Sequence, residues 1–273
     1  MAHALLEGPG AARANPMTDA GGEEIRATSV LPADRHAITL VTADGLRLVG
    51  EVALPAGRAP QATLVCAHPL PTHGGMMDSH LLRKAAWRLP ALADIAVVRF
   101  NTRGTSSAAG TSEGAFDASD GEGLDLAAAV AWVREQGLPD PWLLGWSFGS
   151  DVVLRHGVDL NPAGIIVVSP PLRYTSPAEL AHWNERDCPV VCLVPEDDDY
   201  LQPEAARERF AVVPRAEIVV GEGMGHLWVG EPAVRTVLAE VTARMRPGLA
   251  PLQWQWPDER AQAEGAMERW TDL

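Results

Sequence analysis

The chain has 273 residues, 47% of them hydrophobic, and its formal net charge is -14. A chain of this length can bury a large core, and single α/β domains of this size are common. The negative charge repels phosphate backbones and anionic lipid surfaces, which argues against a nucleic-acid-binding or membrane-surface protein.

Residues 1–34 are rich in Ala, Gly and Pro and show no hydrophobic periodicity, so we expect a loosely ordered segment there. This segment has no basic region followed by an apolar one, and no long apolar run occurs anywhere in the chain. We therefore expect neither a secretory signal nor a membrane span.

Two β-branched runs, 36–42 and 46–54, then flank the turn sequence Ala-Asp-Gly. This pattern predicts an antiparallel hairpin.

From residue 62 onward, continuous apolar runs recur along the chain. Such runs suit strands that are buried on both faces, as in a parallel sheet. The predicted strands are 62–68, 95–100, 141–146, 164–169, 189–194 and 216–220. Segments with helical periodicity lie between and after them, at 79–92, 123–137, 150–157, 177–185, 203–210 and 232–245. This alternation predicts right-handed crossovers and one doubly wound, mostly parallel α/β sheet.

The domain organisation follows from this alternation. We expect one α/β domain over residues 35–247, because the segment shows neither an internal repeat nor a linker. The stretch between the strands 164–169 and 189–194 leaves room for one helix and no inserted lid. Residues 248–273 form a tail that contains tryptophans, and its function cannot be inferred from the sequence.

The three cysteines, Cys66, Cys188 and Cys192, lie in or beside apolar runs. This placement favours buried thiols in a reducing compartment over a disulfide framework. We therefore expect a cytoplasmic protein.

The sequence GWSFG at 145–149 lies between the predicted strand 141–146 and the helix that follows it. It has the Gly-x-Ser-x-Gly form of a nucleophile elbow, a sharp strand-to-helix turn that exposes a serine hydroxyl. Gly145 and Gly149 let the strand and the helix approach closely, and the helix N-terminus favours developing negative charge. An ordinary Gly-bearing β–α turn is the alternative. The flanking strand and helix favour the elbow, with Ser147 as the nucleophile.

A serine nucleophile requires a general base and a carboxylate that orients the base. Two loops at the C-terminal ends of predicted strands supply candidates, since ligand sites of open α/β sheets lie at these ends. The glycine-rich loop 221–230 contains His226, which is the candidate base; a surface histidine is the alternative. The acidic turn 195–203 offers four adjacent carboxylates, and the spacing alone does not choose among them: Glu196, Asp197, Asp198 and Asp199.

Five motifs in this order resemble those of the capless α/β-hydrolase family, whose members carry an HPxPxxGGxM loop, an RFNxRG segment, the elbow, and late Asp and His loops. The resemblance covers about residues 36–246, and the motifs read HPLPTHGGMM (68–77), RFNTRG (99–104), GWSFG, PEDDDYLQP and GMGHLW (223–228). It implies an α/β-hydrolase fold without a lid. In that family the acid loop reads Gly-Glu, one variable residue, then the catalytic Asp, which implies Asp198 rather than its neighbours.

The HPLP sequence also indicates an oxyanion hole. Such a hole takes one amide from the residue after the nucleophile, here Phe148, and one from the loop after the third strand. Pro69 and Pro71 have no N–H, so Leu70 is the expected second donor. Relatives often have a second histidine at the position of Leu70.

Three further features of the sequence are weaker indications of function. The histidines and aspartate of the segment 68–80 do not have the spacing of a metal site, so we expect no metal and no cofactor. His68 either orders the HPLP loop or is a buried structural residue. The long Gly/Ser loop after residue 100 is expected to border the site, and its Arg103 is more consistent with a structural ion pair than with substrate binding.

The sequence thus predicts a serine hydrolase that cleaves a small carboxylic ester through an acyl-enzyme, with a small-molecule acyl substrate. The catalytic residues would be Ser147, His226 and Asp198, with the amides of Leu70 and Phe148 binding the oxyanion. A thioesterase, a lactonase or an acyltransferase would use the same groups. A non-catalytic ligand-binding protein can share the same fold.

Overall fold

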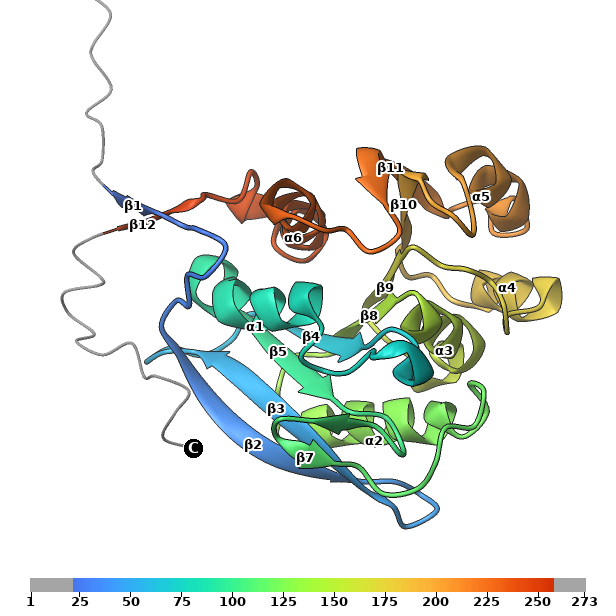
Figure 1. The fold of residues 1–273 in the computed structure, drawn as a ribbon, viewed down its shortest axis with the longest axis horizontal. Helices are drawn as coiled ribbons and strands as arrows, with labels where there is room; N and C mark the ends of the chain where they lie inside the picture. Colours follow the sequence, from blue (N-terminus) through green and yellow to red (C-terminus); the bar gives the residue numbers. More distant parts are fainter. Residues whose placement is uncertain (1–21, 258–273) are drawn as a thin grey trace, which may run out of the picture.

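Eight strands form one sheet within residues 22–257, the part of the chain that the computed structural model describes. The strand order is β11-β10-β9-β8-β4-β5-β3-β2, and helices lie on both faces of the sheet (Figure 1). The strands are β2 (Ala33–Val41), β3 (Arg47–Pro55), β4 (Ala62–Ala67), β5 (Ile95–Phe100), β8 (Pro141–Trp146), β9 (Gly164–Val168), β10 (Val190–Asp197) and β11 (Glu217–Gly225).

The pairing of the strands follows the predicted pattern. β2 pairs antiparallel with β3, and β3 pairs antiparallel with β5, whereas the pairs from β5 through β11 are parallel. Three of the parallel strands, β4, β5 and β9, are buried at every position, which explains why their sequences are apolar without alternation. The predicted fold class, a mostly parallel doubly wound sheet preceded by an antiparallel hairpin, is confirmed.

The helices form two layers. α1 (His80–Ala93) and α6 (Glu231–Met245) pack on one face of the sheet. The other face is covered by α2 (Glu122–Glu135), α3 (Phe148–His156), α4 (Pro177–His182) and α5 (Pro203–Phe210). Side chains of a strand alternate between faces: on β4, Val65 and Ala67 face the α2 and α3 layer, while Leu64 and Cys66 face the α1 and α6 layer.

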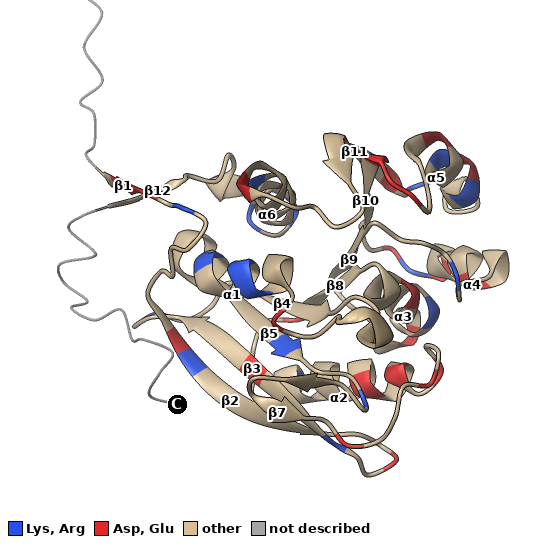
Figure 2. Ribbon diagram, in the orientation of Figure 1, with Lys and Arg blue, Asp and Glu red and all other residues tan. Residues whose placement is uncertain are grey.

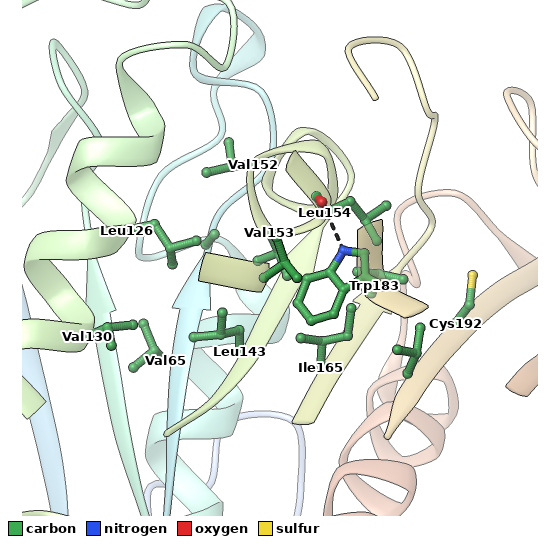
Figure 3. Packing of buried hydrophobic residues seen from close by; sticks show 14 of the residues in the cluster. Val65, Leu126, Val130, Leu143, Val152, Val153, Leu154, Ile165, Trp183 and Cys192 are labelled. Carbon is green, nitrogen blue, oxygen red and sulfur yellow. Dashed lines mark hydrogen bonds between the residues drawn. The ribbon is translucent and has the colours of Figure 1, made fainter. Parts of the chain in front are cut away.

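Trp183 closes the core beneath α3. It begins the short 3-10 turn Trp183–Glu185 and is fully buried. Figure 3 shows its ring beside Val153 and Ile165, with its indole nitrogen directed at the helix above. This Nε1–H donates to the Leu154 carbonyl at 2.9 Å, so the buried polar atom of the ring is satisfied.

The connection between β9 and β10 contains only α4 and this 3-10 turn. No lid is inserted at this point, as predicted. Among the helices of residues 22–257, none has both the length and the apolar character needed to span a lipid bilayer.

The described ends of the chain meet away from the main sheet. β1 (Gly22–Glu24) pairs antiparallel with β12 (Gln255–Pro257). Ile25, Leu31 and Trp256 are buried together against Ala91 of α1, which explains how a stretch without periodicity becomes ordered: it covers an apolar part of a helix. The remainder of the predicted segment 1–34 and of the tail 248–273 lies outside the described residues.

The three cysteines are buried free thiols. Burial raises the pKa of Cys188 and Cys192, and it raises the pKa of Cys66 to about 12. Because the thiolate is the reactive form, these side chains act as small apolar residues of the core.

Candidate active site

The GWSFG segment forms a sharp turn between β8 and α3. Ser147 has φ +52° and ψ −117°, a conformation that is costly for a residue with a side chain. Its N–H donates to the Val168 carbonyl at 2.8 Å. A Cβ at Gly145 would lie 2.3 Å from the Gly149 carbonyl oxygen, and one at Gly149 would lie 2.2 Å from that of Ala67. The two glycines therefore permit the turn to form.

The structure brings Ser147, His226 and Asp198 into one hydrogen-bonded chain. Nε2 of His226 lies 2.9 Å from Oγ of Ser147. Nδ1 of His226 lies 2.9 Å and 3.1 Å from the two carboxylate oxygens of Asp198. Both His226 and Asp198 are buried. The three side chains come from the C-terminal ends of β8, β10 and β11.

The pairing of β10 with β11 explains why Asp198 meets His226. The register shifts between Pro195 and Asp197, and Asp197 then pairs with Gly225 at the last position of both strands. The next residue of each strand is therefore Asp198 on one side and His226 on the other. Parallel strands place successive residues side by side, so the two side chains meet without further adjustment.

Asp198 differs from the other carboxylates of its turn. It is 3% exposed, whereas Glu196, Asp197 and Asp199 are exposed. Burial alone would raise the pKa of Asp198. The hydrogen bonds from His226 and from the N–H groups of Tyr200 and Leu201, together with the attraction of the imidazole, outweigh this and hold its pKa below the ordinary value. A carboxylate that stays ionised beside Nδ1 fixes the proton of the ring on that nitrogen.

The two predicted oxyanion donors lie on segments that are packed together. The Gly149 backbone, one residue beyond Phe148, lies directly against the end of β4, because a Cβ there would also come within 2.9 Å of the His68 carbonyl oxygen. Leu70 lies two residues after His68 and immediately before the 3-10 turn Pro71–His73. Within residues 22–257, neither the Leu70 N–H nor the Phe148 N–H donates a hydrogen bond to another protein group.

His68 ties this loop to the neighbouring strand. Its Nδ1 lies 2.7 Å from the Pro69 carbonyl oxygen, and its Nε2 accepts from the Thr102 N–H at 3.1 Å. These partners require a neutral ring with its proton on Nδ1. Burial lowers the pKa of His68 to about 4. His68 is thus both buried and bonded to the loop that carries Leu70.

Ser169 bonds to His226, and Trp228 bonds to Ser169; the sequence did not indicate either contact. The Ser169 hydroxyl donates to the His226 carbonyl at 2.9 Å and accepts from Nε1 of Trp228 at 2.8 Å. Ser169 directly follows β9 with φ +48°, and Trp228 lies three residues after β11 with φ +50°; positive φ is uncommon for residues other than glycine. The final serine of the run GIIVVS gives no signal of this role, because its partner is a backbone carbonyl.

An aromatic group borders the other side of the elbow. The ring of Phe148 lies 5.3 Å from that of Phe116 and 5.8 Å from that of Tyr174. Phe116 belongs to the long loop after β5, so this loop does border the elbow. Arg103 of the same loop is paired with Asp125 at 2.8 Å and with Asp44 at 3.1 Å, which makes it a structural ion pair.

No protein-family model matches the chain, and no curated protein sequence matches it either. Solved structures do match. The α/β serine hydrolase without lid XC6422 from Xanthomonas campestris is 28% identical, with a TM-score of 0.65, and the match covers 81% of this chain and 98% of that one. An α/β serine hydrolase homologue from Coxiella burnetii is 25% identical, with a TM-score of 0.62 and coverage of 79% and 97%.

The esterase Pf2001 from Pyrococcus furiosus is 17% identical, with a TM-score of 0.62 and coverage of 78% of this chain and 90% of that one. At this identity the likeness concerns the fold alone. The chain therefore has the α/β-hydrolase fold without a lid. The two serine hydrolase structures support hydrolase activity.

The buried ring of His68 predicts a loss of stability in acid. Its pKa is about 6.5 in the unfolded chain and about 4 in the folded one, so the unfolded state binds more protons between these values. The free energy of unfolding should therefore fall as the pH decreases from 7 to 4.5, by roughly 2 to 3 kcal/mol from this group. Urea unfolding of wild type and His68→Gln at both pH values measures this loss. Equal pH dependence in the two proteins would contradict the assignment.

Proposed function

We propose that the protein is a serine hydrolase that cleaves a small carboxylic ester by a Ser-His-Asp triad. The observation that carries the proposal is the chain from Ser147 Oγ to His226 Nε2, at 2.9 Å, and from His226 Nδ1 to Asp198. A strained serine whose hydroxyl is bonded to a buried, oriented histidine is the arrangement that activates a nucleophile. The likeness to serine hydrolases without a lid supports the same conclusion.

The first half of the reaction forms an acyl-enzyme. Oγ of Ser147 attacks the carbonyl carbon, and its proton passes to Nε2 of His226. The carbonyl π electrons move to the oxygen, which the amides of Phe148 and Leu70 bind at the N-terminus of α3. Asp198 stabilises the imidazolium that forms. When the carbonyl reforms, the bond to the leaving oxygen breaks, and His226 gives its proton to the departing alcohol.

The second half releases the acid. Water takes the place of the alcohol, gives a proton to Nε2 of His226 and attacks the acyl carbon. The bond to Oγ of Ser147 then breaks, and the proton returns from His226 to the serine. These steps use only the side chains and amides named, so the proposal includes no metal and no cofactor.

The same groups would serve a thioesterase, a lactonase or an acyltransferase, and assays with each substrate class separate these activities. A non-catalytic ligand-binding protein would need none of the alignment described. Strained backbone persists where the surrounding structure over-determines it, often at functional sites. The strain at Ser147 therefore favours an enzyme over a binding protein.

A fluorophosphonate should label the protein at Ser147 and at no other residue, because within residues 22–257 only the Ser147 hydroxyl contacts a histidine that is itself paired with a carboxylate. Intact mass and peptide mapping measure the adduct. Ser147→Ala should lose labelling. Thr242→Val should keep it, since the Thr242 hydroxyl is buried in α6 and bonded to the Leu238 carbonyl. An absent adduct, or one on another residue, would favour the ligand-binding alternative.

Asp198→Asn should lose most of kcat while the circular dichroism spectrum stays unchanged, because the amide cannot stabilise the imidazolium. Asp197→Asn and Asp199→Asn should each lose less than tenfold, or about 1.4 kcal/mol in activation free energy, since neither carboxylate contacts His226. The comparison uses kcat on one short-chain ester. A large loss at Asp197 or Asp199 instead would show that the assignment of the acid is wrong.

Ser169→Ala should lower kcat about fivefold with little change in KM, because the hydrogen bond of about 1 kcal/mol to the His226 carbonyl is lost. Ser169 is a positioning residue in this proposal, and the rate of fluorophosphonate labelling should fall in parallel with kcat. Thr242→Val, which removes a buried hydroxyl far from the triad, is the matched control for stability. A rise in KM alone, or an equal effect of the control, would remove the positioning role.

A further inference from the structure

The proposed function also determines where the leaving group lies, and the inference below rests on it. His226 must deliver its proton to the departing atom at hydrogen-bond distance. The leaving group therefore lies against the surface that borders His226, and the acyl group lies against the elbow and its aromatic neighbours. The residues on either side of His226 thus decide which leaving groups the site accepts.

The surface beside His226 is apolar although it is exposed. Tyr200 is 68% exposed, Leu227 53% and Val229 77%. They make up three of the seven large apolar side chains that are exposed in residues 22–257, and all three lie on the two loops that carry Asp198 and His226. The Tyr200 ring lies 4.5 Å from the ring of His226. Exposed apolar side chains gathered at one place indicate a binding surface.

A cavity of about 480 Å³ lies between these two loops and the start of α6. His226, Leu227 and Val229 line it, together with Met224 and Pro232. This volume falls within the range of small-molecule sites, which are mostly apolar with a few polar groups. The cavity therefore offers an apolar compartment that includes the proton-donating residue itself.

The charges of the cavity have one sign. Asp199 and Glu222 belong to its lining, and Glu196 and Asp197 precede Asp199 on the same turn, which Figure 2 draws in red between β10 and α5. Among the described residues, no ion pair neutralises these four carboxylates; Glu196 accepts only the N–H of Gly223, at 2.8 Å. Negative potential beside the cavity opposes a negatively charged ligand.

We propose that the cavity beside His226 binds the leaving group, and that this group is a compact, apolar alcohol without negative charge. Apolar contact with Leu227 and Val229 favours such a group. Asp199 and Glu222 disfavour anionic leaving groups, among them the phosphate-bearing carrier of coenzyme A thioesters. Within the reactions that the triad supports, this selects uncharged oxygen esters over thioesters of coenzyme A.

Two matched substrate pairs test the proposal at low ionic strength. One pair is para-nitrophenyl butyrate and its analogue with a carboxylate on the phenyl ring. The other is S-butyryl-N-acetylcysteamine and butyryl-coenzyme A. In each pair the acyl group is the same, and we expect kcat/KM of the neutral member to exceed that of the anionic one by at least about tenfold. The ratio should shrink as salt screens the carboxylates.

Variants link the ratio to the cavity. The double variant Asp199→Asn/Glu222→Gln should reduce the preference for the neutral member about fivefold. Val229→Lys should reduce it as well, because it adds a cation at an exposed position of the lining without disturbing the core. The control Glu135→Gln/Asp159→Asn makes the same change in net charge at exposed positions on α2 and after α3, and should leave the ratio unchanged.

The outcomes separate the two proposals. The leaving-group assignment is wrong, and the esterase proposal stands, if the neutral and anionic members of each pair react equally. The same conclusion follows if the ratio of their kcat/KM values does not change in the cavity variants. The same holds if the control changes the ratio as much as the cavity variants do. If no member of either pair is hydrolysed, the proposed function fails, and the leaving-group assignment fails with it.

Discussion

The candidate site depends on one feature of the sheet, the pairing of Asp197 with Gly225 beyond the register shift in β10. A parallel pair keeps successive residues side by side, so this last pairing makes Asp198 and His226 neighbours by backbone geometry. Without the shift, Asp198 would pair with Met224 and lie two positions out of register with His226. The hydrogen bonds of Asp198 to Tyr200 and Leu201 then hold the turn in place. The turn between β8 and α3 then places Ser147 within hydrogen-bond distance of His226.

Three residues with φ near +50° lie beyond the C-terminal ends of strands: Ser147 directly after β8, Ser169 directly after β9, and Trp228 three residues after β11. Their strain is offset by hydrogen bonds between neighbouring strands. The Ser147 N–H bonds to Val168 and the Ser169 N–H bonds to Leu193. Ser169 also joins the indole of Trp228 to the His226 carbonyl. Hydrogen bonds between the turns after β8, β9 and β11 therefore stabilise these turns, in addition to the packing of the core.

The fold followed closely from the sequence because its signals are local. Runs such as 95–100 are apolar throughout, and the structure has a strand with the same bounds, β5. The extension of β10 and β11 past their apolar runs was missed, since it depends on pairing between two strands and not on composition. Ser147 and His226 could be proposed from motif and chain order. Asp198 required a resemblance, because four adjacent carboxylates carry the same local signal and differ only in burial. Ser169 and Tyr200 gave no sequence signal at all.

The acidic turn after β10 combines two kinds of carboxylate within a few residues. Asp198 is buried, paired with His226 and held ionised by hydrogen bonds. Asp197 and Asp199 are exposed, and neither bonds to the ring. A charge that is buried and paired acts on its partner over a short distance, whereas exposed, unpaired charges set the potential of the surrounding surface. A turn with one buried carboxylate and several exposed ones can therefore orient His226 and repel anions from it at the same time. This gives the excess of acidic residues in the turn a physical consequence beyond solubility.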